Sequence, residues 1–149
     1  MLTVRGKHNG RQVFCSVVLM PIEQLDGIGL DISKEPNIQI LTGLIDTGAT
    51  TTSITPSAVA KLDLTPSGVR RVSHAAGSSL RSAYVFRVGF LNGNESAQNL
   101  LIPDEAVEGM ELPYDALPFD VLIGMDILSQ GKMILTNRSF EFQYNPLKI

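Results

Sequence analysis

Apolar and β-branched residues recur along most of this chain in runs of strand length, and turn-forming residues separate the runs. Two such runs, residues 2–7 and 12–20, are rich in Val, Thr, Phe and Leu, and the Asn9-Gly10 pair between them is a signal for a tight turn. We therefore predict a β-hairpin within an N-terminal extension that comprises residues 1–36.

A nearly continuous apolar run at residues 38–45 is typical of a strand buried on both faces, and it leads directly into Asp46. Residues 119–123 have the same pattern and lead into a short helix, which we predict over residues 124–130 with Gly131 at its end. The remaining apolar segments predict further strands at residues 83–91, 98–102, 133–135 and 139–144. The last two strands are expected to flank a turn at Asn137-Arg138.

A second short helix has clear end signals. Thr55 can cap its N-terminus, Pro56 suits the first helical position, and residues 57–62 contain good helix formers. We predict a helix that begins at Pro56.

The later stretch of residues 103–118 combines acidic residues with prolines, and this composition predicts a surface loop. No repeat and no linker interrupts the chain. The pattern as a whole predicts one mostly-β domain over residues 1–149, with one or two short helices and a core at about residues 38–144.

The composition narrows the classes of function. With 12 Lys and Arg against 15 Asp and Glu, the net charge is −3, and no basic block provides the positive surface of a nucleic-acid-binding protein. No apolar run reaches the roughly 18 residues of a membrane span, and the first residues lack the apolar core of a signal peptide. We therefore expect a cytoplasmic protein with no membrane or nucleic-acid partner. One Cys and two His cannot form an internal disulfide or a closed zinc site, so we expect no metal and no cofactor.

The common nucleophile and phosphate-binding motifs do not occur in the sequence. Cys15 lies in the middle of a predicted apolar strand, which favours an inert buried thiol over a catalytic Cys–His pair. The acidic residues between positions 103 and 118 lack the alternating ligands and central Gly of a calcium loop, so solvated loop charge is favoured there.

Asp46 is the candidate that remains, because it follows a buried strand directly. Two interpretations are open for the Asp46-Thr47-Gly48 triplet. It can be a plain turn, in which the Asp side chain bonds a backbone amide two residues further on. It can also present a carboxylate for catalysis. The three residues alone do not decide between them.

The surrounding residues resemble two markers of the retropepsin-like aspartic proteases. Residues 44–50 have the form of that family's active-site segment, in which apolar residues precede Asp-Thr-Gly-Ala and a small hydroxyl residue. Residues 119–128 resemble the second marker, an apolar strand that ends at Ile123-Gly124 and leads into a short helix. The resemblance covers roughly residues 38–144. Between the markers lies the segment of His74, Ala75, Ala76, Gly77 and Ser78. It occupies the place of the family's flap, which is a hairpin that folds over the substrate.

This resemblance implies an all-β fold, a small closed acid-protease barrel with one or two short helices and half of an active site in each chain. It implies that Asp46 is catalytic, that Thr47, Gly48 and Ala49 support the loop, and that the strand ending at Ile123 and Gly124 packs beneath it. Two carboxylates about 3 Å apart share one proton, and such a pair can activate water against a peptide bond. We interpret Asp126 as a charge at a helix terminus rather than as a second catalytic acid.

The sequence contains one Asp-Thr-Gly and no Asp-Ser-Gly, so a chain supplies half of such a pair. The simplest completion is a homodimer with Asp46 of each subunit facing across a two-fold axis, acting on a peptide or protein substrate. The strand at residues 139–144, with Phe140, Phe142 and Tyr144 on one face, could enter a sheet shared by the two subunits. An ordinary last strand of the monomer core is the favoured interpretation.

Two other hypotheses remain. The same fold could serve as a non-catalytic peptide-binding or dimerisation module, or the chain could be a monomeric β-domain in which Asp46 only makes a turn. The intact Asp-Thr-Gly favours the enzyme. The chain departs from the family pattern in its N-terminal extension, in the long connection at residues 103–118, and in a flap tip that has two alanines.

Overall fold

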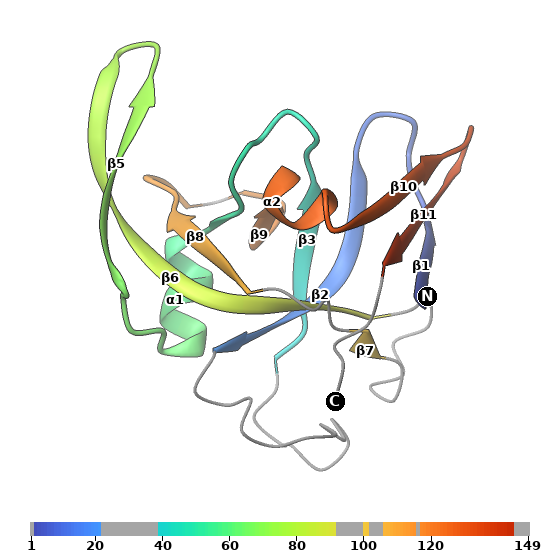
Figure 1. The fold of residues 1–149 in the computed structure, drawn as a ribbon, viewed down its shortest axis with the longest axis horizontal. Coiled ribbons are helices and arrows are strands. Elements are labelled where there is room, and N and C mark those ends of the chain that lie inside the picture. The colour runs from blue at the N-terminus through green and yellow to red at the C-terminus, as the bar shows by residue number, and fades with distance from the viewer. Residues whose placement is uncertain (1, 22–38, 92–99, 102–105, 116, 145–149) are drawn as a thin grey trace.

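The computed structural model describes residues 2–21, 39–91, 100–101, 106–115 and 117–144 (Figure 1). Most of these residues lie in strands, which confirms the predicted all-β class. The helices are α1 (Pro56–Leu62) and α2 (Met125–Leu128). The strands are β1 (Leu2–Lys7), β2 (Val13–Pro21), β3 (Leu41–Ile45), β4 (Ser53–Ile54), β5 (Gly68–His74), β6 (Gly77–Leu91), β7 (Leu100–Leu101), β8 (Val107–Glu111), β9 (Val121–Ile123), β10 (Gly131–Leu135) and β11 (Ser139–Tyr144).

The larger sheet closes on itself. Its strand order is β2-β3-β9-β4-β8-β6-β5, and β6 also pairs with β2, so the strands from β2 to β6 in this order form a small closed barrel. Most pairs are antiparallel, but β3 and β9 run parallel, as do β4 and β8. Large apolar side chains fill the interior, and Ile54, Phe86 and Ile123 have no exposed surface. The prediction of a closed barrel is confirmed.

The predicted N-terminal hairpin is wrong in its pairing. The turn forms, because the Asn9 side chain accepts the backbone N–H groups of Arg11 and Gln12 and Gly10 has φ +85°. The two strands then separate: β1 pairs with β11, whereas β2 pairs with β3 and β6. The buried Val17 shows why, since β2 supplies apolar side chains to the barrel core. Residues 13–21 are therefore part of the barrel wall rather than an extension.

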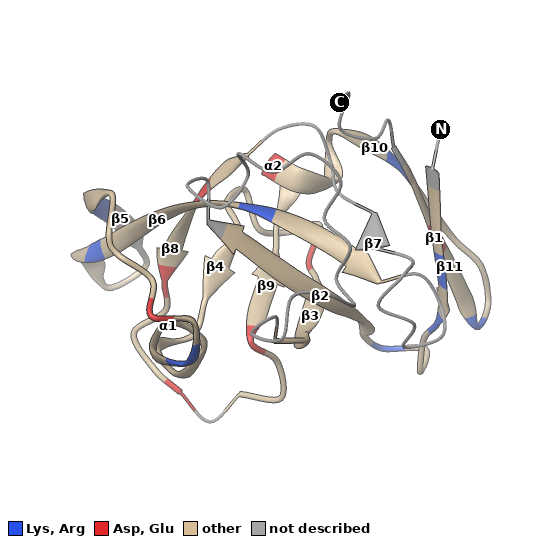
Figure 2. Cartoon of the chain, turned by 90° about the horizontal axis from the view of Figure 1, so that it is seen from below, with Lys and Arg blue, Asp and Glu red and all other residues tan. Residues whose placement is uncertain are grey.

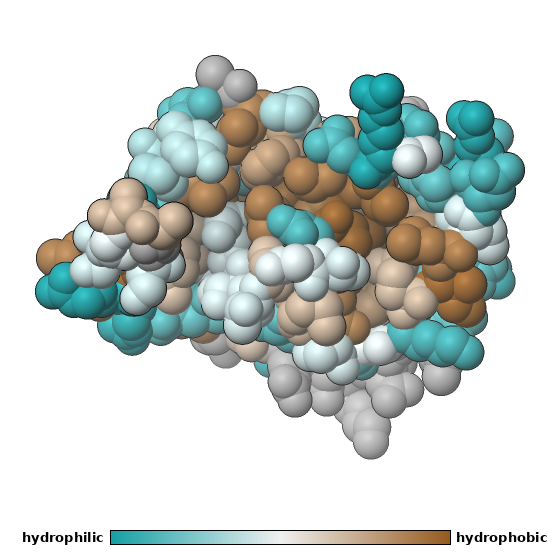
Figure 3. All heavy atoms as spheres, turned by 90° about the horizontal axis from the view of Figure 1, so that it is seen from above, coloured by the Kyte–Doolittle hydropathy of each residue, from teal (hydrophilic) through white to brown (hydrophobic). Residues whose placement is uncertain are grey.

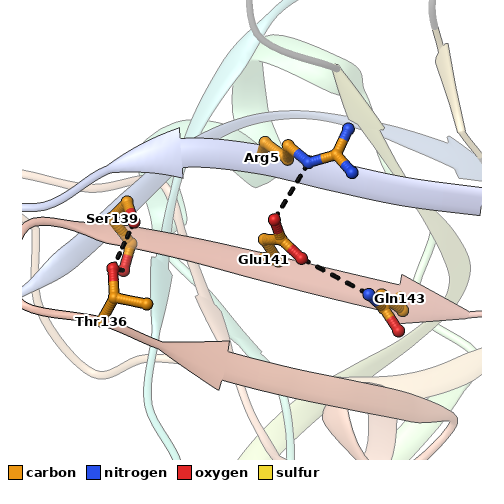
Figure 4. Close-up of polar contacts among 5 residues, drawn as sticks. All are labelled: Arg5, Thr136, Ser139, Glu141 and Gln143. Carbon is orange, nitrogen blue, oxygen red and sulfur yellow. Dashed lines mark hydrogen bonds and ion pairs between the residues drawn. The ribbon is translucent and has the colours of Figure 1, made fainter.

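Strands β1, β11 and β10 form a second, antiparallel sheet. Phe140 and Phe142 are buried on one face, and the Phe142 ring meets the Phe90 ring of the barrel edge to face, with centroids 5.4 Å apart. On the exposed side, Arg5 bonds Glu141 at 3.0 Å across the β1–β11 pair, and Glu141 contacts Gln143 (Figure 4). Within this chain β11 is therefore a strand of the monomer's own core.

Hydrogen bonds also close the β10–β11 turn. The Thr136 and Ser139 hydroxyls bond each other in this turn (Figure 4). The Thr136 backbone N–H donates to the carbonyl of Ser139 at 3.0 Å. The turn predicted between these strands is confirmed.

The predicted surface loop at residues 103–118 contains strand β8, which lies between β4 and β6 in the barrel. In this strand Glu108 lies between Val107 and Gly109, which are both buried. A Cβ on Gly109 would lie 2.5 Å from the Phe86 ring, so a glycine lets β8 approach β6 closely. The charged residues hid this strand from composition-based prediction.

Other predicted elements need smaller adjustments. Strand β3 begins at Leu41 rather than at residue 38, which lies outside the described residues, and Thr42 is exposed, so the strand is not buried on both faces. The strand expected at 98–102 is described only at Leu100–Leu101, where it pairs with the end of β6. Helix α1 begins at Pro56, and the Thr55 hydroxyl accepts the N–H of Ala58, as its end signals predicted.

Candidate active site

The loop that carries Asp46 leaves the barrel where β3 and β9 run side by side. The parallel ladder pairs Ile45 with Ile123, and the Asp46 backbone N–H extends the ladder by donating to the Ile123 carbonyl at 2.9 Å. The completely buried Ile123 therefore fixes the start of the loop. In Figure 1 the loop after β3 lies at the top of the barrel, close to α2.

The Asp46 side chain is oriented by its own turn. Its Oδ1 accepts the Gly48 backbone N–H at 2.9 Å, and the Asp46 carbonyl accepts the Ala49 N–H at 3.2 Å. Asp46 and Ala49 are half-buried, while Thr47 and Gly48 are exposed. A Cβ on Gly48 would lie 3.2 Å from Asp46 Oδ1, tighter than most contacts. The turn and the catalytic interpretation are therefore compatible, because the turn holds a half-exposed carboxylate in one direction.

Residues of the second marker hold the same loop in place through backbone hydrogen bonds. The Met125 N–H donates to the Ala49 carbonyl at 2.8 Å, and the Asp126 N–H donates to the Thr50 carbonyl at 3.2 Å. A Cβ on Gly124 would lie 2.7 Å from the Thr51 carbonyl carbon and 2.9 Å from the Ala49 oxygen. Both neighbours are backbone atoms, so only glycine fits this position. The structure thus brings Ile123 and Gly124 together with Asp46 and Ala49.

Sequence reasoning missed a buried polar cluster behind the loop. Thr52 has no exposed surface, and Asp126 accepts both its backbone N–H, at 2.9 Å, and its hydroxyl, at 2.7 Å. The Thr52 hydroxyl in turn accepts the Gly124 N–H at 3.1 Å, and Asp126 also accepts the Ile127 N–H. Asp126 does lie at a helix terminus, as interpreted, but its carboxylate also fastens the far end of the Asp46 loop to α2. No local pattern reveals this contact, because 74 positions separate Thr52 from Asp126.

The residues predicted as a flap form the tip of the β5–β6 hairpin. His74 and Gly77 are the last paired residues, and Ala75 and Ala76 make the turn between them. Gly77 has φ +127°, a conformation that side-chain-bearing residues rarely adopt. Figure 1 shows this hairpin rising to the same end of the molecule as the Asp46 loop, with its concave side toward that loop. The hairpin stands beside the loop rather than on it.

Apolar surface is exposed at the end of the molecule that carries the loop. In Figure 3, which views this end of the molecule from above, hydrophobic residues gather over the middle of the face. Met125, whose backbone N–H donates to the Ala49 carbonyl, is 40% exposed. An exposed apolar area of this kind is typical of surfaces that bind another molecule.

Cys15 lies close to this site but is poorly suited to nucleophilic chemistry. It pairs with Gly43 across β2 and β3, and its Sγ lies 3.8 Å from the Gly43 carbonyl. Although the residue as a whole keeps some exposed surface, burial of the thiol raises its pKa to about 12. A thiol that stays protonated near neutral pH is a weak nucleophile.

Within the described part of the chain, no three His, Cys, Asp or Glu side chains come together as a metal site would require. None of its helices has the length and apolar character needed to cross a bilayer.

The comparison with protein families is decisive. A model of the aspartyl protease family matches residues 37–127, which include the Asp46 loop, the flap hairpin and the strand that ends at Gly124. The chain belongs to the aspartyl protease family.

Solved structures agree on the fold of this aspartyl protease family member. A retropepsin-like aspartic protease from Rickettsia conorii is 14% identical with a TM-score of 0.50, over 98% of this chain and 97% of that one. The protease of simian foamy virus (mac) is 15% identical with a TM-score of 0.44, over 78% of this chain and 92% of that one. No curated protein matches the sequence. The match to the Rickettsia conorii protease shows that the chain has a retropepsin-like fold.

Proposed function

We propose that this protein is an aspartic endopeptidase, in which Asp46 from each of two identical subunits activates the water that hydrolyses a peptide bond. The observation that carries the proposal is the Asp46 carboxylate itself. It is half-exposed, oriented by the Gly48 amide, and held on a loop that the Gly124 segment supports from below. Family membership makes this loop the natural place for the chemistry.

The reaction needs a pair of carboxylates that hold one proton between them. The ionised carboxylate takes a proton from water as the water oxygen attacks the carbonyl carbon, and the protonated one hydrogen-bonds the carbonyl oxygen. The tetrahedral intermediate then collapses, the C–N bond breaks, and the leaving nitrogen receives a proton from the pair. Because one shared proton is required, cleavage should fall on both sides of an acid-range optimum.

A dimer completes the pair, since the sequence holds a single Asp-Thr-Gly. The exposed Thr47 at the loop tip and the exposed Met125 beside Ala49 are suited to contact a second copy. The apolar middle of the face in Figure 3 offers the surface for such a contact. A peptide in extended conformation would then lie between the two loops and under the flap tips at residues 74–78, with its backbone bonding strand edges.

The test is Asp46→Asn, which keeps the side-chain size and an oxygen for the Gly48 amide but cannot take the proton. Wild type should cleave unfolded casein or a peptide library at acid pH and be inhibited by a pepstatin-type statine peptide. The variant should lose at least about 10³-fold in kcat and remain a folded dimer. Thr50→Ser, at an exposed position of the same loop, is the matched control.

Three results would contradict this proposal. Equal cleavage by wild type and Asp46→Asn would remove Asp46 from the chemistry. Peptide binding by both proteins without any turnover would identify a non-catalytic peptide-binding module instead. Sedimentation that finds only monomer at high concentration would exclude the paired site.

A further inference from the structure

A forked ion pair joins the flap hairpin to the barrel. Arg70 Nε lies 2.8 Å from Glu108 Oε1, and Arg70 Nη2 donates to Glu108 Oε2 at 3.0 Å. Two parallel N–H···O contacts of this kind are stronger and more directional than a single contact between charges. Both side chains remain partly exposed, at 49% and 33%.

This pair spans a strand that lies between its two members. Arg70 is on β5 and Glu108 on β8, and β6 lies between these strands in the sheet. Among the described strands, β5 pairs only with β6, and residues 77–82 of β6 pair only with β5. The upper hairpin is thus a two-stranded ribbon beyond the end of the barrel. The Arg70–Glu108 contact is a side-chain link that runs from this ribbon directly to the barrel wall.

Strand register places the link on one face of the hairpin. Arg70 lies opposite Arg81 and Glu108 opposite Val85, and residues 81, 83 and 85 share a face of β6. This face is the more sheltered one, since Val72 and Ser79 are half-buried on it. The other face bears Val69 and Leu80, which are 57% and 60% exposed.

Charges on the hairpin make Glu108 the natural partner. Residues 68–83 contain Arg70, Arg71 and Arg81 but no Asp or Glu. Figure 2 shows basic segments on the β5–β6 hairpin and an acidic segment on the neighbouring β8. Arg81 directly opposes Arg70 and adds like charge, so Glu108 supplies the nearest compensation for this face. Arg71 points to the other face and bonds the Ser78 hydroxyl at 3.1 Å.

We propose that Arg70 and Glu108 are positioning residues, which hold the flap in its curved posture and set how readily it opens for substrate. The proposal rests on the proposed protease function, since it assigns a role to the flap of that site. Loss of the link should populate open flap conformations, so that substrate binds more weakly while the chemistry at Asp46 is unchanged.

The first experiment compares Arg70→Gln with Arg71→Gln, which removes the same charge one residue along, from the opposite face. Arg70→Gln is expected to raise KM roughly two- to fivefold with little change in kcat, because a partly exposed ion pair contributes modestly. Arg71→Gln is expected to leave KM within experimental error. Equal shifts in the two variants would overturn the proposal, because the effect would then be one of net charge.

The second experiment exchanges the charges of Arg70 and Glu108. Glu108→Arg and Arg70→Glu should each raise KM, and the double variant should recover most of the loss, since it restores an opposite pair across the same distance. In wild type, KM should rise with NaCl toward the Arg70→Gln value, whereas the KM of Arg70→Gln should depend less on salt. A double variant no better than the two single variants would contradict the proposed link.

Hydrogen exchange separates this inference from the proposed function. Backbone amides of residues 70–80 should exchange several-fold faster in Arg70→Gln than in Arg71→Gln, and the same difference should be found in the inactive Asp46→Asn background. Unchanged exchange would refute the flap role even if the enzyme is active. If the wild-type protein has no protease activity and Arg70→Gln still exchanges faster, the proposed function is refuted and the mechanical link remains supported.

Discussion

The Asp46 loop and the flap hairpin are held in place by different means. Backbone hydrogen bonds to Ile123, Met125 and Asp126 clamp the loop, and the buried Thr52 closes its far end. In the upper hairpin, the described part of β5 pairs only with β6, and the Arg70–Glu108 ion pair on the surface links β5 to the barrel. In the proposed dimeric protease, a carboxylate that meets a partner at about 3 Å benefits from a rigid support, whereas a cover that admits substrate benefits from a weaker one.

Among substitutions in and around the Asp46 loop, we expect Gly124→Ala to be the most damaging. Its Cβ would lie within 3 Å of three backbone atoms of the loop, so the loop must shift and Asp46 with it. We expect destabilisation of about 1–3 kcal/mol and a loss of kcat of about 100-fold or more. Urea unfolding and peptide-cleavage assays measure these effects. Ser129→Ala, at the exposed end of α2, is the control, and a fully active Gly124→Ala would show that the loop tolerates displacement.

Thr52→Val tests the polar cluster with a smaller expected effect. The substitution conserves shape but leaves the Gly124 N–H without its acceptor and Asp126 with one donor fewer. The expected cost is about 1–3 kcal/mol in unfolding free energy, with a fall in kcat. Thr52→Ser, which keeps the hydroxyl, should recover most of both quantities. Thr50→Val, at an exposed position, should change neither. If Thr52→Ser behaves as Thr52→Val does, the methyl group rather than the hydroxyl matters there.

The pH dependence of stability at Cys15 tests the barrel wall next to the Asp46 loop. Its pKa is raised by burial from 9.0 to about 12, so the folded state favours the neutral thiol. The resulting stabilisation is complete below pH 9 and is lost as pH rises from about 9 toward 12. The loss should be about 1.4 kcal/mol per pH unit at most. Urea midpoints of wild type and Cys15→Ala should therefore converge in this window, and native Cys15 should react slowly with iodoacetamide. Fast native alkylation would show that this part of the barrel opens readily.

The smallest effect is expected for the ion pair between Arg5 and Glu141 in the second sheet. Its side chains are 65% and 33% exposed, so Glu141→Gln should cost no more than about 0.5 kcal/mol in thermal unfolding. Flap hydrogen exchange should be the same as in wild type. A larger change at the flap would mean that surface charge in general, rather than the Arg70–Glu108 contact, governs the hairpin.

Local sequence signals predicted the elements with short-range causes well. The α1 start at Pro56 and the turn at residues 136–139 followed from capping and turn chemistry, and the mostly-β class followed from apolar runs of strand length. The closed barrel was implied by the resemblance to the retropepsin-like family, and the strand order confirms it. Predictions failed where a distant partner decided the outcome. Strand β8 was hidden by its acidic residues, because Gly109 and Val107 reveal their inward orientation only against Phe86 of β6. The first two strands were expected to pair, yet β1 found β11 at the other end of the chain.

The sequence by itself determined the Asp46 turn, since Gly48 two residues on supplies the amide that orients the carboxylate. It also determined that neighbouring residues of a strand point to opposite sides of the sheet, because alternation is a property of the strand alone. The tertiary structure decided which strands pair, why Gly124 must be a glycine, and which contacts hold Thr52 and Arg70. These contacts join residues far apart in the chain. Their free energy exists only when the barrel has closed, so no local pattern can encode them.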